Sequence, residues 1–289
     1  MMQLRTEGPA IRPPAVAGLF YPAEPAQLRA EVLRLLAQAA LAPAGLRAKA
    51  LIAPHAGYAY SGAAAAAAFA ALGAEVAEAV RRIVLIGPSH HVAFRGIAAP
   101  RAEAFTTPLG RVPVDREALS GLADLPFVGL ADGPHAPDHA LEVELPFLQL
   151  RLGAFAAVPL LVGEASPQEV AELLGCLWGG PETLIVVSSD LSHFHAYETA
   201  QRLDAGTAAA IERGDWSGLG PGHACGFLAV AGLLIEAGRH GLQARRLALC
   251  NSGDTAGPRE RVVGYGAWAF EEHADHRWPA AMQDDPARG

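Results

Sequence analysis

The chain has 289 residues, of which 51% are hydrophobic, and its formal net charge is -8 at pH 7. This length suits one large α/β domain, and the apolar fraction is ample for its core. We expect no nucleic-acid partner, because phosphate binding needs a clustered basic face and the sequence has no run of Lys and Arg.

The sequence also argues against export and membrane insertion. Residues 1–14 carry charges and lack the apolar core of a signal peptide. The apolar stretch 62–72 is too short for a bilayer, which takes about 20 residues to cross. Three cysteines are too few and too sparse for a disulfide framework. We therefore expect a cytoplasmic protein whose thiols remain free for metal or redox chemistry.

Short apolar runs alternate with amphipathic stretches along the chain. The expected strands are residues 50–53, 83–87, 158–162, 184–188 and 247–250. The expected helices are residues 25–40, 61–72, 167–178, 197–213 and 223–237. The third of these helices starts with an N-cap serine, a proline at the first helical position and a glutamate placed for a capping box.

Strands that are apolar on both faces and separated by helices predict a mostly parallel sheet with helices on each side. We expect residues 1–272 to form a single three-layer α/β domain and residues 273–289 to form a loose polar tail. Residues 96–115, with Pro108-Leu109-Gly110 in the middle, are expected to form an inserted antiparallel hairpin.

Polar residues gather directly after four of the expected strands. His55 follows the first strand, His90 and His91 follow the second, residues 188–193 follow the fourth, and residues 251–254 follow the fifth. A single such group is usually a helix cap or a turn. Four of them predict one shared ligand site, since parallel strands end at one edge of the sheet.

Two imidazoles alone do not define a metal site. The third ligand could be Asp190, His139 or Cys225. Cys225 stands among small residues near the expected start of a helix, where the helix dipole favours a thiolate. It could equally be a small buried hydrophobe. Cys176 lies among leucines and is expected in the core. The core is also the favoured location for Cys250.

The choice between His90 and His91 as the inward side chain also stays open, because adjacent side chains diverge. A further polar loop, residues 132–139, leads into Glu142 and Glu144. Its two histidines suit acid–base work beside a site, although it could be only a solvated loop.

Six motifs, in this order along the chain, make the sequence resemble the Memo-like proteins, whose bacterial members include AmmeMemoRadiSam system protein B. The motifs extend from about residue 13 to residue 270 as a set that is much more specific than any one motif. They are Ala15-Val16-Ala17-Gly18-Leu19-Phe20-Tyr21-Pro22, Ala53-Pro54-His55-Ala56-Gly57-Tyr58, Gly87-Pro88-Ser89-His90-His91, Asp138-His139-Ala140-Leu141-Glu142, Ser188-Ser189-Asp190-Leu191-Ser192-His193 and Ala224-Cys225-Gly226.

The resemblance implies a fold like that of the class III extradiol dioxygenases, which hold a non-haem Fe(II) with two His and one carboxylate. Carried over by position, the metal ligands fall on His55, His90 and Cys225. His193 matches the acid/base histidine, and Asp190 and His139 match other pocket residues. Thiolate in place of carboxylate favours iron or copper, with zinc possible, and speaks against ring cleavage.

These residues suggest a metal-dependent redox enzyme of unknown substrate. Ser189, Asp190 and His139 would orient His193 or bound oxygen and water, and Tyr58 and Tyr60 would line the entrance. The family name suggests AMMECR1-like and radical SAM proteins as partners. The competing hypotheses are a non-enzymatic protein that binds metal or a partner in the same pocket, and a zinc hydrolase with the same ligands.

Overall fold

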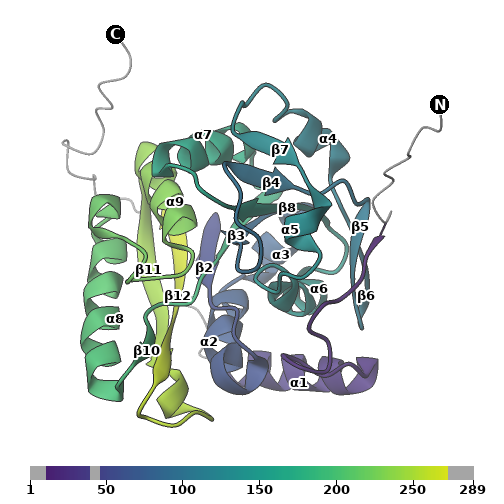
Figure 1. Cartoon of the computed structure of the whole chain (residues 1–289). Coiled ribbons are helices and arrows are strands. Elements are labelled where there is room, and N and C mark those ends of the chain that lie inside the picture. Colours follow the sequence, from purple (N-terminus) through teal and green to yellow (C-terminus); the bar gives the residue numbers. More distant parts are fainter. Residues whose placement is uncertain (1–10, 40–45, 273–289) are drawn as a thin grey trace, which may run out of the picture.

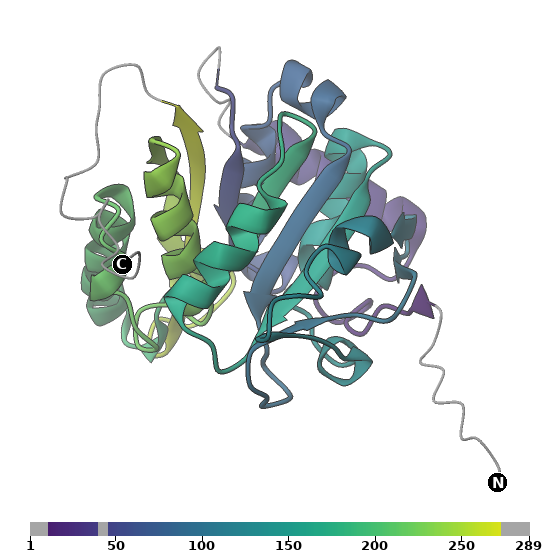
Figure 2. The same ribbon diagram turned by 90° about the horizontal axis from the view of Figure 1, so that it is seen from above.

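The computed structural model describes residues 11–39 and 46–272, so the predicted tail lies outside the described residues. Nine strands form one mixed sheet, in the order β10-β12-β2-β9-β3-β8-β4-β7, with β11 also paired to β12. Helices cover both faces of this sheet (Figures 1 and 2). The predicted three-layer α/β architecture is confirmed, and it is consistent with an extradiol dioxygenase-like fold.

Four parallel strands form the centre of the sheet. They are β2 (Ala50–Ala53), β9 (Thr183–Ser188), β3 (Arg82–Pro88) and β8 (Ala156–Val162). Nearly every residue in them is buried, which explains why these strands are apolar on both faces. All four were predicted to within two residues.

The sheet continues beyond β2 through a long strand that the sequence analysis missed. This strand, β12 (Val262–Glu272), runs antiparallel to β2, β10 (His193–His195) and β11 (Leu242–Asn251). Since β11 is antiparallel to β12, it runs in the same direction as the central strands. Its carboxyl end therefore does lie at the predicted edge of the sheet, although β11 does not pair with the parallel core.

The other edge of the sheet ends in β4 (Ile97–Ala99) and β7 (Val128–Leu130). The predicted hairpin is confirmed for β5 (Ala104–Thr107) and β6 (Gly110–Pro113), which pair antiparallel around a tight turn. They form a small separate sheet with β1 (Ile11–Arg12). The first residues of the predicted hairpin instead join the main sheet as β4.

The long helices lie in two layers. One layer contains α1 (Pro25–Gln38), α2 (Tyr58–Ala70) and α6 (Leu145–Leu152), and the other contains α7 (Pro167–Leu177), α8 (Tyr197–Glu212) and α9 (Phe227–Arg239). The capping box predicted at the start of α7 is present. Shorter helical segments are α3 (Ala74–Ala79), α4 (Arg116–Ser120), α5 (Asp132–His135), η1 (Glu142–Glu144), η2 (Trp216–Gly218) and η3 (Ser252–Asp254).

Two predictions about cysteines need correction. Cys176 is exposed, because α7 turns Val170, Leu173 and Leu177 inward and Cys176 lies on the opposite side of the helix. The helix predicted from residue 223 begins only at Phe227, so Cys225 lies in the loop before it. Within residues 11–39 and 46–272, no helix has the length and apolar character needed to cross a bilayer.

Candidate metal centre

Three side chains from separate parts of the chain meet at the carboxyl edge of the parallel strands. His55 follows β2, His90 follows β3 and Cys225 precedes α9. One potential ligand atom from each lies within 4.8 Å of the other two. The Sγ of Cys225 is 3.4 Å from Nε2 of His55, and the rings of His55 and His90 are 5.0 Å apart between centroids.

His55 is held from both its backbone and its ring. Its backbone N–H donates to Oδ1 of Asp190 at 2.9 Å, and its Nδ1 lies 2.7 Å from Oγ of Ser188. The residue is only 1% exposed. Burial, followed by the neighbouring His90 and His139, holds the pKa of His55 well below its usual value, so the ring is neutral and able to bind a metal ion.

His90 is more open and is backed by a carboxylate. Asp138 accepts from the backbone N–H of His90 at 2.6 Å and from its Nδ1 at 3.2 Å. A third bond to Asp138 comes from the backbone N–H of Ala140 at 2.9 Å. These hydrogen bonds hold the pKa of Asp138 below its usual value despite burial, so it is ionised. Carboxylate–imidazole pairs of this kind orient histidine ligands in metal sites.

Cys225 is fixed against the loop after β9. Its backbone N–H donates to the carbonyl oxygen of Asp190 at 3.2 Å, and the N–H of Asp190 points at its Sγ from 3.3 Å. The next residue must be small, because a Cβ on Gly226 would come within 2.8 Å of the Cβ of Ser189. Ser189 accepts from the N–H of Gly226 at 3.0 Å. These contacts hold the loop after β9 against the loop before α9 at the cluster.

The chemistry of the donor set fits a bound cation. Burial, with Asp190 nearby, raises the pKa of the Cys225 thiol to about 12 in the absence of any ion. A thiolate at this position therefore needs a positive charge to stabilise it, and the neutral ring of His55 beside it supplies none. Two imidazole nitrogens and one thiolate suit iron, copper and zinc, and three protein ligands leave coordination positions open.

Two further histidines lie beside the cluster. Nδ1 of His193 donates to the carbonyl oxygen of Leu191 at 2.8 Å, which leaves Nε2 with a free lone pair, and burial lowers the pKa of His193. The ring of His139 stacks on His90 at 4.6 Å and meets His55 edge-on at 5.4 Å. Burial, and then His90, lowers the pKa of His139 to about 4, so it is neutral near pH 7.

Asp190 connects the groups without joining the set of ligand atoms. One carboxylate oxygen binds the backbone of His55, while its own backbone binds Cys225 on both sides. Burial raises the pKa of Asp190 to about 7. Its position suits the orienting role expected of it.

Several predicted site residues lie elsewhere. His91 is exposed, with its ring 6.2 Å from that of His139, and it is His90 that joins His55 and Cys225. Tyr58 is buried and its hydroxyl donates to the carbonyl oxygen of Val143. Tyr60 is 42% exposed. Cys250, which was expected in the core and not in the site, is only half-buried on β11.

Sequence reasoning missed the residues behind the two histidines. Ser188 and Asp138 belong to the motifs of the family resemblance and Glu144 follows the polar loop 132–139, but none of the three was assigned a specific role. Charge near a predicted histidine was the only available signal, because the pairing of Asp138 with His90 joins positions 48 residues apart. Glu142, also unassigned, is fully buried and binds Arg12, Tyr21 and two backbone N–H groups, which anchors the first described residues to the loop that bears His139.

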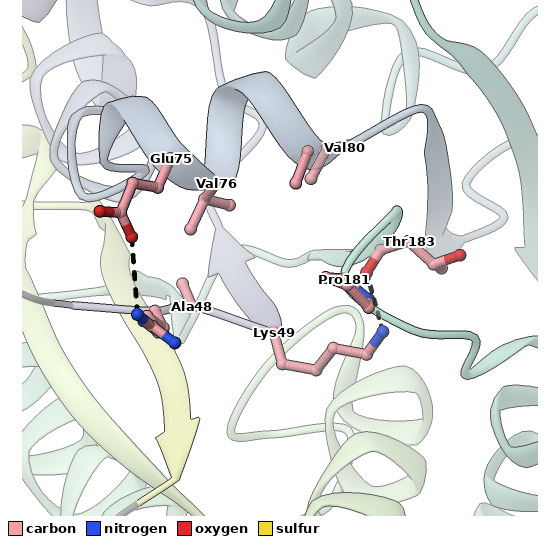
Figure 3. A pocket seen from close by; sticks show the side chains of 9 residues that line it. Ala48, Lys49, Glu75, Val76, Val80, Pro181 and Thr183 are labelled. Atoms are coloured by element: carbon pink, nitrogen blue, oxygen red, sulfur yellow. Dashed lines mark hydrogen bonds and ion pairs between the residues drawn. The ribbon is translucent and has the colours of Figure 1, made fainter.

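A cavity of about 300 Å³ lies at the opposite, amino-terminal end of the central strands, between α3 and the starts of β2 and β9 (Figure 3). Val76, Ala79 and Val80 give it an apolar wall. Its charged groups are already paired, since Arg47 faces Glu75 at 3.6 Å and Lys49 donates to the carbonyl oxygens of Gly180 and Thr183. It shares no residue with the His/His/Cys cluster.

Fold and cluster together define an α/β protein with a candidate metal centre at the carboxyl edge of its parallel strands. The family model described as "Memo-like protein" matches residues 12–269. Proteins described as "MEMO1 family protein" from Methanosarcina mazei and Ignicoccus hospitalis are each 32% identical, with 90% of this chain covered and 99% and 98% of theirs. One from Methanosarcina acetivorans is 33% identical with similar coverage. The chain belongs to the Memo-like family.

Proposed function

We propose that this protein binds one redox-capable metal ion, iron or copper, through His55, His90 and Cys225, and acts as a metal-dependent redox enzyme on an unidentified substrate. The observation that carries the proposal is the convergence of two imidazoles and one thiol, whose potential ligand atoms lie within 4.8 Å of one another. When bound, such a metal supplies one-electron and oxygen chemistry that no side chain of this cluster can supply.

The surrounding residues have roles that follow from their contacts. His193 presents a free Nε2 and can accept or deliver a proton there, since its Nδ1 is committed to the carbonyl of Leu191. His139 lines the site as a neutral, stacked ring. Asp190 fixes the positions of His55 and Cys225 relative to each other.

The test is an anaerobic titration of the same metal-free protein with Fe(II), Cu(I) and Zn(II), followed by exposure to oxygen. We expect one equivalent of iron or copper to bind tightly and to change oxidation state, as followed by electronic and paramagnetic resonance spectra. Tight binding of zinc alone, with iron and copper weak or inert to oxygen, would favour a hydrolase or a non-catalytic metal protein. No tight binding of any of the three would refute the metal centre.

We also propose AMMECR1-like and radical SAM proteins as partners, on the family resemblance alone. Co-purification of tagged protein with each candidate, in the presence and absence of metal, tests this. A retained complex is expected, and failure to bind either protein in both metal states would remove the partner proposal while leaving the metal centre intact.

A further inference from the structure

The Oγ of Ser188 has three polar neighbours. It lies 2.7 Å from Nδ1 of His55, 2.6 Å from the carbonyl oxygen of Ala140 and 3.1 Å from Oε1 of Glu144. Ser188 and Glu144 are both 0% exposed, so these contacts are out of reach of bulk solvent.

Counting protons decides the direction of each bond. A hydroxyl has one proton to donate and two lone pairs with which to accept. The carbonyl of Ala140 can only accept, and it is the nearest neighbour, so it takes the proton of Ser188. The serine oxygen must then accept from His55. This requires the proton of the His55 ring to be on Nδ1, which leaves the lone pair of Nε2 facing Cys225.

Glu144 supplies the third hydrogen bond to the hydroxyl of Ser188. The second lone pair of Ser188 Oγ is matched by a proton on Glu144, and burial raises the pKa of Glu144 well above its usual value. An ionised Glu144 would compete with Ala140 for the single serine proton and would leave one buried acceptor without a partner. Oε2 of Glu144 already lacks a hydrogen-bond partner among the described residues, which a neutral acid tolerates better than a carboxylate.

The two histidines are thus backed by different groups that meet at one residue. The carbonyl of Ala140 binds Ser188, behind His55, and its N–H binds Asp138, behind His90. His90 has an ionised carboxylate at Nδ1, whereas His55 has a neutral hydroxyl. The ring of His90 is thus backed by a charged group and the ring of His55 by an uncharged one.

We propose that Ser188 and Glu144 are positioning residues, which hold His55 as its Nδ1–H tautomer so that Nε2 is always free to bind metal. The tautomer itself does not depend on the proposed function. Only the expected effect on metal affinity rests on it.

The first test needs no metal. Long-range proton–nitrogen correlation spectra of the metal-free protein, labelled with ¹⁵N at histidine, report which ring nitrogen carries the proton. We expect His55 to show Nδ1–H in the wild-type protein and to shift towards Nε2–H in Ser188→Ala. An Nε2–H signal in the wild-type protein, or an unchanged tautomer in Ser188→Ala, would overturn the proposal.

Glu144 is tested by two substitutions. In Glu144→Gln an amide N–H replaces the acid proton, so the Nδ1–H signal should persist, whereas Glu144→Leu should lose part of it. If Glu144→Gln behaved like Ser188→Ala, the neutral-acid assignment would be wrong. Thr207→Val is the matched control, because it removes another buried hydroxyl, on α8, that donates to a backbone carbonyl away from the site.

Metal affinity provides the second readout. Loss of a group behind a metal-binding histidine typically weakens binding by roughly 10- to 100-fold, and we expect a loss of this size in Ser188→Ala but not in Thr207→Val. Equal affinities would limit Ser188 to a structural role and overturn the positioning claim. If the wild-type protein bound no metal, the proposed function would fail, while the tautomer spectra would still decide the direction of the hydrogen bonds.

Discussion

At the scale of single residues, Cys225 and Cys176 form a matched pair, because both are free thiols and only one lies at the histidine cluster. Cys225→Ser should reduce metal affinity by about 100-fold or more, since a hydroxyl is a poor substitute for a thiolate ligand. Elemental analysis of the purified variant should therefore find much less than one equivalent of metal. Cys176→Ser, on the exposed side of α7, should keep the wild-type stoichiometry.

A full equivalent of metal in Cys225→Ser would show that the third donor lies elsewhere. The candidate would then be Asp138 or His139, because these two residues form a second group of potential ligands with His90. The Cys176→Ser control excludes the possibility that loss of any thiol has the same effect.

His193 allows proton transfer to be separated from metal binding. Its Nδ1 is bound to a backbone carbonyl, and it does not belong to the His55, His90 and Cys225 group. His193→Ala should therefore retain one equivalent of metal and lose turnover by on the order of 100-fold, the usual contribution of a general acid or base. Metal loss with an unchanged circular dichroism spectrum would instead make His193 a ligand.

At the scale of elements, α7 depends on its first turn. The hydroxyl of Ser166 accepts from the N–H of Glu169, and the carboxylate of Glu169 accepts from the N–H of Ser166. Ser166→Ala should lower the free energy of unfolding by about 1 kcal/mol, because the backbone N–H of Glu169 loses its acceptor. Urea denaturation measures the change.

The control for this helix cap is Ser120→Ala at the end of α4, where the exposed hydroxyl donates to a carbonyl within its own helix. We expect that substitution to change stability by less than about 0.5 kcal/mol. Both variants should keep the metal stoichiometry, since neither residue belongs to the cluster. Equal stabilities of the two variants would argue against the capping box.

At the scale of the whole molecule, stability should fall in mild acid because of His135. This histidine is 2% exposed, its Nε2 donates to the carbonyl oxygen of Ala98, and burial lowers its pKa to about 4. In the unfolded chain His135 has a pKa near 6.5 and binds a proton below that pH. In the folded protein it stays neutral until the pH approaches 4. The free energy of unfolding should therefore drop by about 2 kcal/mol from pH 7 to pH 5 through this group.

Denaturation curves at several pH values, compared with those of His135→Gln, isolate this contribution. The glutamine amide can donate to the same carbonyl but does not titrate, so the variant should show a shallower dependence between pH 6.5 and pH 4. Parallel curves for the two proteins would show that other groups cause the acid sensitivity.

Much of the architecture follows from local patterns in the sequence. Residues 50–53, 83–87, 158–162 and 184–188 are apolar on both faces, and only a buried parallel strand places such runs between helices. The same reasoning puts His55 and His90 at one edge, because both directly follow such strands. Strand β12 escaped this reasoning, since its alternation of Gly, Tyr, Ala and Trp lacks the continuous apolar run that marks the other strands.

The sequence by itself determined the three-layer fold, the edge of the sheet where the polar residues gather and, through the order of its motifs, the family. Only the tertiary structure decided which groups stand behind the histidines and that His90, not His91, joins His55 and Cys225. Ser188, Glu144 and Asp138 reach their partners across 44 to 133 residues of chain, and Cys225 reaches His55 across 170. Contacts of that separation leave no local periodicity, and packing of the whole sheet and its loops creates them.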